Sequence, residues 1–206
     1  MSDAARGHLA MLLFSALVAG SFSLGGMVAN EIAPAAINAV RFAIAAVVIG
    51  AVVAATGRFD RSALEAPWRY LVLGGLFAAY FVLMFEGLKT APPVSASAVF
   101  TLTPVMSAGI GWLLLRQVTT PRMAAALAIG AAGALWVIFR ADLSALLALE
   151  VGQGELIYFV GCVAHAFYTP MVRKLNRGEP PVVFSFGAMI GAALLVPAAG
   201  WGALPP

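Results

Sequence analysis

The sequence predicts an all-α fold, a polytopic transmembrane helix bundle. Hydrophobic residues make up 62% of the chain and charged residues only 10%, and the mean hydropathy is +0.97. A soluble domain carries charge on about a quarter of its residues, so this composition excludes that class. The apolar residues gather into seven stretches, each near the roughly 20 residues that a helix needs to cross a bilayer. Short basic links separate several of them, as membrane loops require.

The seven apolar stretches predict seven transmembrane helices. The first follows Arg6 and continues past Gly20 without a small-residue cleavage site, so we interpret it as a membrane helix and not a signal peptide. The second opens at Pro34, and the link RQVTTPR between the fourth and fifth predicts a helical hairpin with a basic turn. The predicted spans are residues 9–29, 35–55, 70–88, 94–115, 123–139, 156–172 and 182–199.

Small residues and prolines modify these helices. Ser107 with Gly111 on the fourth span, and Ala126, Gly130 and Ala134 on the fifth, predict close helix packing. Pro104 and Pro170 predict kinks that free a backbone carbonyl. The segment ADLSALLALE between the fifth and sixth spans is too short to cross; its leucines at 143, 146, 147 and 149 fit either a short interfacial helix or a surface loop.

The distribution of Lys and Arg predicts a cytoplasmic N-terminus. With that orientation only Lys89 and Arg140 lie outside, and Arg41 is set aside because it lies within a span. Trp68 and Trp112 then fall at inner span ends, and Trp136 and Trp201 at outer ends. The residues predicted inside are Arg6, Arg58, Arg61, Arg69, Arg116, Arg122, Arg173, Lys174 and Arg177.

A weak internal repeat divides the chain. A shift of 147 residues places Gly7 on Gly154 and Pro34 on Pro181, with five spans between the copies. Because five is odd, the second copy enters the membrane from the opposite side, and such inverted repeats are a mark of secondary transporters. We therefore expect a first five-helix repeat at 1–140 and two helices of a second, truncated repeat at 154–206. A dimer or a second chain completing the bundle is the alternative to truncation.

The residue pattern also weighs against several other classes. The net charge of +3 comes from residues spread over short loops and not from one basic patch, so we expect no nucleic-acid partner. Cys162 lies alone in an apolar span. No metal-spaced His or carboxylate cluster, phosphate-binding Gly loop or nucleophile beside a His is present in the sequence, so we expect no metal, no cofactor and no enzyme activity.

Charged residues inside spans are costly and usually functional, which singles out two. Arg41 lies about two turns into the second span and Glu86 within a turn of the outer end of the third, so we predict that they form a charge pair. The alternative is that both side chains reach the outer interface and that Glu86 pairs with Lys89.

Neutral polar residues supply the other candidates for substrate binding. His165 lies near the centre of the sixth span, with Tyr168 and Thr169 on part of the same helical face. It is either a substrate or proton site, or a neutral histidine bonded to a neighbouring helix. The further candidates, which could equally serve helix packing, are Tyr80, Asn38, Ser21, Ser97 and Thr101.

The order of several short motifs resembles the EamA-like family of the drug/metabolite transporter superfamily. They are Gly20-Ser21, with Ala19 where tryptophan is usual; Arg41-Phe42; GLKT at 87–90; SASA at 95–98; and LTPV at 102–105. The sequence departs from the family in having Arg116-Gln117 where Gly-Glu is usual, and seven helices where ten are usual.

This resemblance implies an inner-membrane exporter or permease for small metabolites such as amino acids. We expect alternating access around a cavity lined by the first, third, fourth and sixth helices, with a small-molecule substrate and the lipid bilayer as partners. The alternative is a truncated, non-transporting membrane protein or assembly partner. An intramembrane enzyme is a third class, for which the sequence offers no catalytic cluster.

Overall fold

The computed structural model describes residues 2–57, 59, 61–148 and 150–200, and over these residues it contains helices and no strand. Arg58, Leu149 and Trp201, which entered the sequence predictions, lie outside the described residues. The helices are α1 (Asp3–Val28), α2 (Pro34–Thr56), η1 (Arg61–Leu64), α3 (Trp68–Leu88), α4 (Pro93–Phe100), α5 (Thr103–Leu115), α6 (Pro121–Ile138), α7 (Leu143–Ala148), α8 (Gln153–Leu175) and α9 (Pro181–Gly200).

The predicted polytopic helix bundle is confirmed. Within the described residues, six helical segments are long and apolar enough to cross a membrane, with α4 and α5 counted together as one segment. The seventh predicted span corresponds to α9, whose apolar part, Pro181–Pro197, is shorter than the other six. The chain is therefore a multi-pass membrane protein.

Prolines set many of the helix boundaries. Proline stands in the first turn of α2, α4, α6 and α9, where its missing N–H and fixed φ are compatible with a helix start. Thr120 caps α6 by accepting a 3.3 Å hydrogen bond from the Met123 backbone N–H. The predicted span 94–115 is one candidate membrane-crossing segment, Pro93–Leu115, and where a kink was predicted at Pro104 the helix is interrupted between Phe100 and Thr103.

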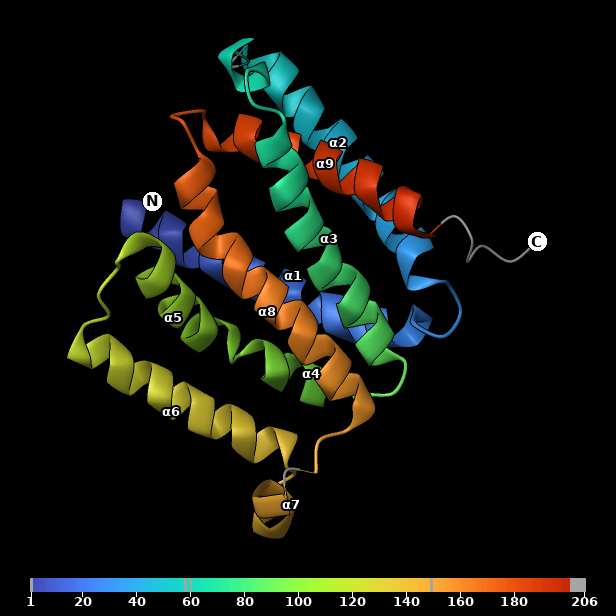
Figure 1. The fold of residues 1–206 in the computed structure, drawn as a ribbon, viewed down its shortest axis with the longest axis vertical. Coiled ribbons are helices and arrows are strands. Elements are labelled where there is room, and N and C mark those ends of the chain that lie inside the picture. Colours follow the sequence, from blue (N-terminus) through green and yellow to red (C-terminus); the bar gives the residue numbers. More distant parts are fainter. Residues whose placement is uncertain (1, 58, 60, 149, 201–206) are drawn as a thin grey trace.

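The segment between α6 and α8 forms a short exposed helix and not a plain loop, and its place in the membrane interface stays a prediction. The Asp142 carboxylate caps α7 by accepting hydrogen bonds from the backbone N–H groups of Ser144 at 2.8 Å and Ala145 at 3.2 Å. Leu147 on this helix is 79% exposed. In Figure 1, α7 lies at the edge of the molecule, beyond the end of α6.

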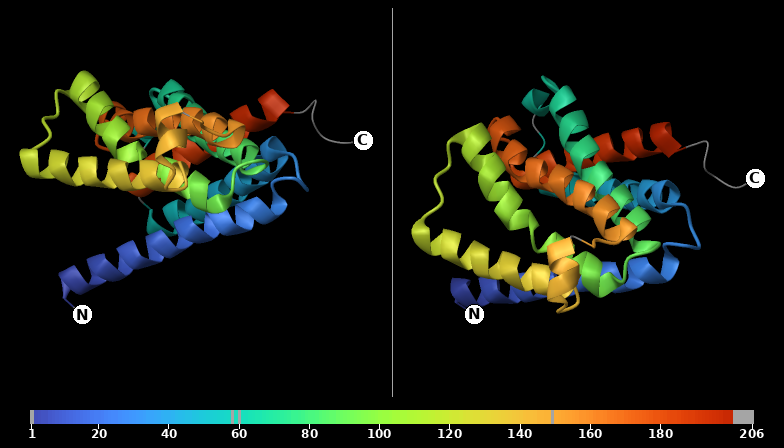
Figure 2. Two further views of the ribbon diagram at one scale, coloured as in Figure 1. Left: turned by 90° about the horizontal axis from the view of Figure 1, so that it is seen from below. Right: turned by 60° about the horizontal axis from the view of Figure 1, so that its bottom comes forward.

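Helix α3 lies at the centre of the packing. It contacts α8 along most of its length and α9 near its N-terminal end, and α2 packs against α9 (Figure 1). Helix α1 lies along one face of the bundle, as both views of Figure 2 show. Two buried clusters follow from this arrangement, one joining α3 to α1, α4 and α8 and the other joining α3 to α2 and α9.

Glycines allow the two closest helix contacts. A Cβ at Gly154 of α8 would overlap the backbone of Gly87 at the end of α3, and a Cβ at Gly191 of α9 would overlap the backbone of Tyr70. Such contacts substitute for the hydrophobic driving force that is absent between helices in lipid. These close contacts explain why α3 has neighbours on several sides.

The close helix packing predicted from small residues of the fourth and fifth spans is found at some of them only. Gly111 and Ala134 are buried. A Cβ at Gly130 of α6 would meet no atom within 4 Å, and α6 packs mainly against α4, which belongs to the fourth predicted span. Ser107 faces α8 instead, where its hydroxyl donates a 3.4 Å hydrogen bond to the Ala166 carbonyl. Ala166 lies four residues before Pro170, so Ser107 satisfies the carbonyl that this proline leaves free.

Candidate functional site

His165 on α8 lies inside a cluster of aromatic rings. Its ring centroid is 4.6 Å from that of Tyr80, 5.6 Å from Phe100 and 5.9 Å from Tyr168. The side chain is half-buried, and its Nδ1 atom is buried without a hydrogen-bond partner among the described residues. Because buried polar atoms are nearly always satisfied, an unpartnered ring nitrogen marks a place for a ligand or water.

A hydrogen bond between two tyrosines fixes one side of this cluster. The Tyr158 hydroxyl donates to the Tyr80 hydroxyl at 3.0 Å, and both side chains are buried. The bond joins α8 to α3 one to two turns of α8 before His165. Tyr158 was not among the predicted site residues, because an aromatic residue in an apolar span gives no sequence signal that separates packing from binding.

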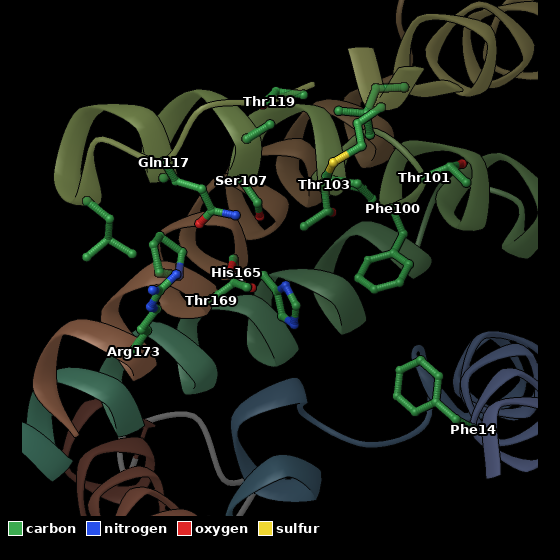
Figure 3. Close-up of a pocket in the computed structure, with 17 residues that line it drawn as sticks. Phe14, Phe100, Thr101, Thr103, Ser107, Gln117, Thr119, His165, Thr169 and Arg173 are labelled. Atoms are coloured by element: carbon green, nitrogen blue, oxygen red, sulfur yellow. Dashed lines mark hydrogen bonds between the residues drawn. The ribbon is translucent and has the colours of Figure 1, made fainter. Parts of the chain in front are cut away.

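A cavity of about 610 Å³ opens beside His165. Its walls come from α1, α4, α5, α6 and α8. These helices belong to the first, fourth, fifth and sixth predicted spans, and no residue of the third span (α3) is among the lining residues. Figure 3 shows Gln117 and Arg173 at one side of the cavity and Phe100 and Thr103 at another, with His165 between them. Its polar lining residues are Thr101, Thr103, Ser107, Gln117, Thr119, His165, Thr169 and Arg173.

A second polar cluster lies on the other side of α3, around Arg41. The guanidinium donates to Asn38 Oδ1 at 3.3 Å and to Ser21 Oγ at 3.5 Å. It also lies over the rings of Phe81 and Phe85, at 4.8 and 5.2 Å from their centroids. Three predicted candidates, Ser21, Asn38 and Arg41, therefore meet in one place, and Phe81 connects this cluster to Tyr80 through a ring contact of 4.8 Å.

The predicted pair of Arg41 and Glu86 is not formed. Glu86 Oε2 lies 2.7 Å from Lys89 Nζ, three residues along the chain, so the alternative pairing is the one the structure contains. Both partners keep about a third of their side-chain surface exposed, at 39% and 35%. The physical reason is reach: Glu86 meets its i+3 neighbour on the same helix face, while the aromatic rings of α3 hold the arginine.

Two of the predicted hydroxyls serve their own helix. Ser97 donates to the Val94 carbonyl at 2.7 Å, and Thr101 donates to the Ala98 carbonyl at 2.5 Å. Thr101 nevertheless lines the cavity beside His165, whereas Ser97 does not. Bonds of this kind satisfy a hydroxyl within its own helix, and the predicted roles of both residues in binding or in packing between helices stay predictions.

A buried carboxylate near the start of α8 was not among the predicted site residues. Glu155 is 7% exposed and accepts a 2.7 Å hydrogen bond from the Ser95 hydroxyl of α4. The predicted span began one residue later, at 156, which left Glu155 in a loop. The signal that could have found it is its place three residues after Gly152, the N-cap position, where Glu is favoured in a first helical turn.

A buried ion pair joins α3 to the loop between α8 and α9. Arg69 donates to Glu179 Oε1 at 2.6 Å and to the Leu175 carbonyl at 2.7 Å, and the two charged side chains are 1% and 6% exposed. Burial alone would raise the pKa of Glu179. The hydrogen bonds from Arg69 and from the backbone N–H of Arg177, together with the charge of Arg69, outweigh burial and hold that pKa below its ordinary value.

Among the described residues, no three His, Cys, Asp or Glu side chains gather in a geometry that could hold a metal ion. The residues of the two clusters supply aromatic surfaces, hydroxyls, one imidazole and the guanidiniums of Arg41 and Arg173. These groups can bind and orient a small molecule through ring contacts, hydrogen bonds and charge.

Comparison with known proteins shows the family of this chain. The model of the EamA-like transporter family matches residues 5–139. The protein described as uncharacterized transporter YyaM of Bacillus subtilis (strain 168) is 28% identical over 193 residues, which cover 92% of this chain and 63% of that protein. A solved crystal structure, described only as that of a protein, is 25% identical with a TM-score of 0.61, covering 92% of this chain and 64% of that one. The chain thus spans somewhat less than two thirds of the length of either relative.

Proposed function

The chain belongs to the EamA-like transporter family, and from this premise we propose that it is a secondary transporter of small metabolites such as amino acids. It works as an exporter or permease of the inner membrane by alternating access, with its N-terminus in the cytoplasm. The similarity to a protein described as an uncharacterized transporter supports the transport class. The remaining support comes from the site.

The observation that carries the proposal is the unpartnered Nδ1 atom of His165 beside a cavity in the membrane-spanning part of the chain. A cavity of about 610 Å³ lies within the range of about 300–1,000 Å³ that is usual for ligand sites. Polar side chains inside a membrane domain are expensive, so they mark substrate pathways more often than they mark simple packing.

The lining of the cavity favours a molecule with an apolar part and a few polar groups. Rings of Phe100, Tyr80 and Tyr168 surround the imidazole and offer apolar surface. Ser107 and Thr169 add hydroxyls, and Arg173 adds a positive charge. An amino acid has this combination of a side chain, a carboxylate and an ammonium.

Breaks in two of the helices that line the cavity support alternating access. The helix is interrupted between α4 and α5 at Thr101 and Leu102, and α8 contains Pro170. Discontinuous helices are where secondary transporters place their binding sites, because freed backbone groups there face a cavity. Both features lie beside His165.

A thermal-shift screen of the purified chain in detergent tests this function. We expect at least one amino acid in a panel of amino acids and related metabolites to raise the melting temperature of the wild-type chain. His165→Leu should abolish the shift while the variant still inserts into the membrane. His8→Leu is the matched control, because it makes the same chemical change at an exposed position of α1.

Two results would contradict the proposal. If no compound in the panel shifts the wild-type chain, the cavity does not bind this class of metabolite. If His165→Leu and His8→Leu respond alike, His165 is a packing residue and the binding site lies elsewhere.

The second candidate function is that of a non-transporting membrane protein or an assembly partner. The chain spans 63% of the length of its relative from Bacillus subtilis, so the activity of the whole relative does not pass to it directly. A chain of that kind would show no substrate flux on its own.

A further inference from the structure

We propose that Arg41 is the anchor of a carboxylate-binding site and that its ligand is a small organic carboxylate with an apolar body. This inference takes its biological ligand from the proposed transport function, because it assigns the carboxylate of the transported metabolite to Arg41. The binding test below does not depend on transport.

The charge of Arg41 is not neutralised by any carboxylate that the structure describes. Its hydrogen bonds go to two neutral groups, Asn38 and Ser21, at 3.3 and 3.5 Å. Glu86, the acid that the sequence predicted as the partner of Arg41, is paired with Lys89 instead. Charged groups within a membrane span usually find a partner, and arginine stays charged in proteins, so a lone guanidinium here requires an anion from outside the described chain.

The orientation of the guanidinium leaves its edge available. The Cζ atom of Arg41 lies 4.8 Å from the ring centroid of Phe81 and 5.2 Å from that of Phe85. These cation–π contacts involve the charge of the guanidinium and do not occupy its N–H groups. Arginine has five N–H donors, and only two hydrogen bonds, both long, are made. The remaining donors can bind a carboxylate through two parallel hydrogen bonds.

Asn38 holds the guanidinium in this orientation. Its side chain is fully buried, and its Nδ2 donates to the Pro34 carbonyl at 2.8 Å and to the Phe81 carbonyl of α3 at 3.4 Å. Both donors of the amide are therefore directed away from Arg41, so the amide oxygen must face it and accepts its hydrogen bond. Asn38 is a positioning residue, and it ties the orientation of Arg41 to the contact between α2 and α3.

The space beside Arg41 determines the rest of the ligand. A cavity of about 470 Å³ lies there, between α2, α3 and α9. Its other lining side chains are all apolar, and they include Phe42, Ile49, Phe77 and Met189. A ligand that fills it gains by burying an apolar body and by placing a single negative charge on Arg41.

The proposed site is separate from the His165 cavity but adjacent to it. Phe77 and Phe81 line the Arg41 cavity. The same Phe77 ring contacts Tyr168 at 4.9 Å and His165 at 6.4 Å, so one aromatic wall of α3 separates the two spaces.

Isothermal titration calorimetry on the full chain in dodecyl maltoside micelles tests the site, with empty micelles as the blank. The probe is phenylacetate, and 2-phenylethanol has the same apolar body without the charge. Wild-type protein should bind phenylacetate saturably and at least about tenfold more tightly than 2-phenylethanol, since hydrogen bonds to charged groups are the strong ones. Arg41→Gln should lose this preference, and Arg41→Lys should keep only part of it because lysine lacks the planar fork.

Arg122→Gln is the matched control, because it removes an exposed arginine at the start of α6 and should leave the preference intact. Equal binding of the acid and the alcohol by the wild-type chain would overturn the proposal, even if Arg41→Gln failed to fold. A preference that survives in Arg41→Gln would overturn it as well. Loss of phenylacetate binding when phosphatidylglycerol is added would show that a lipid phosphate occupies Arg41 instead.

The two proposals fail separately. Absence of substrate flux with an intact preference for phenylacetate would overturn the transport function and leave the carboxylate site standing. Flux that is the same in Arg41→Gln and in Arg122→Gln, without any preference for phenylacetate, would overturn the carboxylate site alone.

Discussion

Tyr80 joins the two sides of the candidate site. Its ring lies 4.6 Å from that of His165 on one side and 4.8 Å from that of Phe81 on the other. Its hydroxyl accepts the hydrogen bond of Tyr158, so its position is fixed from α8. The Tyr80 ring therefore lies between His165 and the Arg41 cluster.

Removing the Tyr158 hydroxyl should destabilise the protein measurably. We expect Tyr158→Phe to lower the free energy of unfolding by about 1 kcal/mol, because a buried hydrogen bond is lost and the Tyr80 hydroxyl loses its partner. Tyr168→Phe is the control, since the Tyr168 hydroxyl makes no hydrogen bond to any residue that the structure describes. Thermal unfolding in detergent measures both, and equal losses would show that the tyrosine pair adds nothing specific.

At the scale of helices, α3 holds the bundle together through close contacts that only small residues permit. Gly154 of α8 packs against Gly87, and Gly191 of α9 packs against the backbone of Tyr70. The two contacts lie toward opposite ends of α3, so they fix α8 and α9 relative to it. The orientation of His165, which is carried by α8, depends on the first of them.

Adding one methyl group at Gly154 should therefore separate α3 and α8. We expect Gly154→Ala to destabilise the protein by about 1–3 kcal/mol, because the new Cβ would lie 2.6 Å from both the Ala91 nitrogen and the Thr90 hydroxyl. Gly130→Ala, which meets no atom within 4 Å, should be neutral or slightly stabilising. Melting curves in detergent compare the two, and a Gly154→Ala variant as stable as Gly130→Ala would rule out the close contact.

The ion pair of Arg69 and Glu179 is a second constraint on α3. The pKa of Glu179 is lowered in the folded protein from its ordinary value of 4.5. A carboxylate with a lowered pKa stabilises the folded state fully above the ordinary value, and this contribution is lost as the pH falls through the lower folded-state value. The stabilisation by this pair should therefore be constant near neutral pH and decline in acid.

Glu179→Gln tests that statement. At neutral pH we expect a loss of about 3 kcal/mol in the free energy of unfolding, because Arg69 keeps its charge in a buried place. Below pH 4.5 the difference from the wild-type chain should shrink. Glu65→Gln changes an exposed acid near the same end of α3 and serves as the control. A Glu179→Gln effect that does not change with pH would contradict the pairing.

The sequence predicts helices better than it predicts their neighbours. Hydropathy and N-terminal prolines determine most helix boundaries locally, which is why the starts at Pro34, Pro93 and Pro181 were close to those predicted. Pro104 predicted a kink, whereas the structure has a break in the helix after Phe100. A proline removes a backbone hydrogen bond and clashes with the preceding turn, and here the effect is large enough to interrupt the helix. Glu179 and Arg69 are 110 residues apart, and no local pattern brings them together.

The site shows the same limit. Polar residue types in apolar spans indicated His165, Asn38 and Arg41 as candidates, because such residues are rare inside a membrane. The prediction that Glu86 is the partner of Arg41 was wrong. The sequence does not show that two phenylalanine rings of α3 contact the guanidinium. Depth along a helix can be estimated from the sequence, whereas the direction a side chain takes depends on the neighbouring helix.

On the scale of the whole molecule, the proposed orientation places successive loops on opposite sides of the membrane. The turn between α5 and α6 should then face the cytoplasm, and α7 should face the outside. Val118 in the turn and Leu147 on α7 are matched sites, with exposed fractions of 80% and 79%. They allow a direct comparison of the two sides.

Single cysteines at these two positions test the orientation in a chain in which Cys162 is replaced. A membrane-impermeant thiol reagent should label Leu147→Cys in intact cells and should label Val118→Cys only after the cells are permeabilised. The equal exposure of the two side chains removes accessibility within the protein as an explanation for a difference. Labelling of Val118→Cys and not Leu147→Cys in intact cells would invert the topology.

Counterflow in sealed proteoliposomes tests the central claim most directly, namely that this chain carries a small metabolite across a membrane through the site at His165. Vesicles are loaded with the unlabelled amino acid that gives the largest thermal shift, then diluted into a trace of the same amino acid carrying a radiolabel. The account predicts transient accumulation of label with the wild-type chain and with His8→Leu, and little or none with His165→Leu. Accumulation by the wild-type chain no greater than that of protein-free vesicles would contradict transport and leave the non-transporting membrane protein as the function.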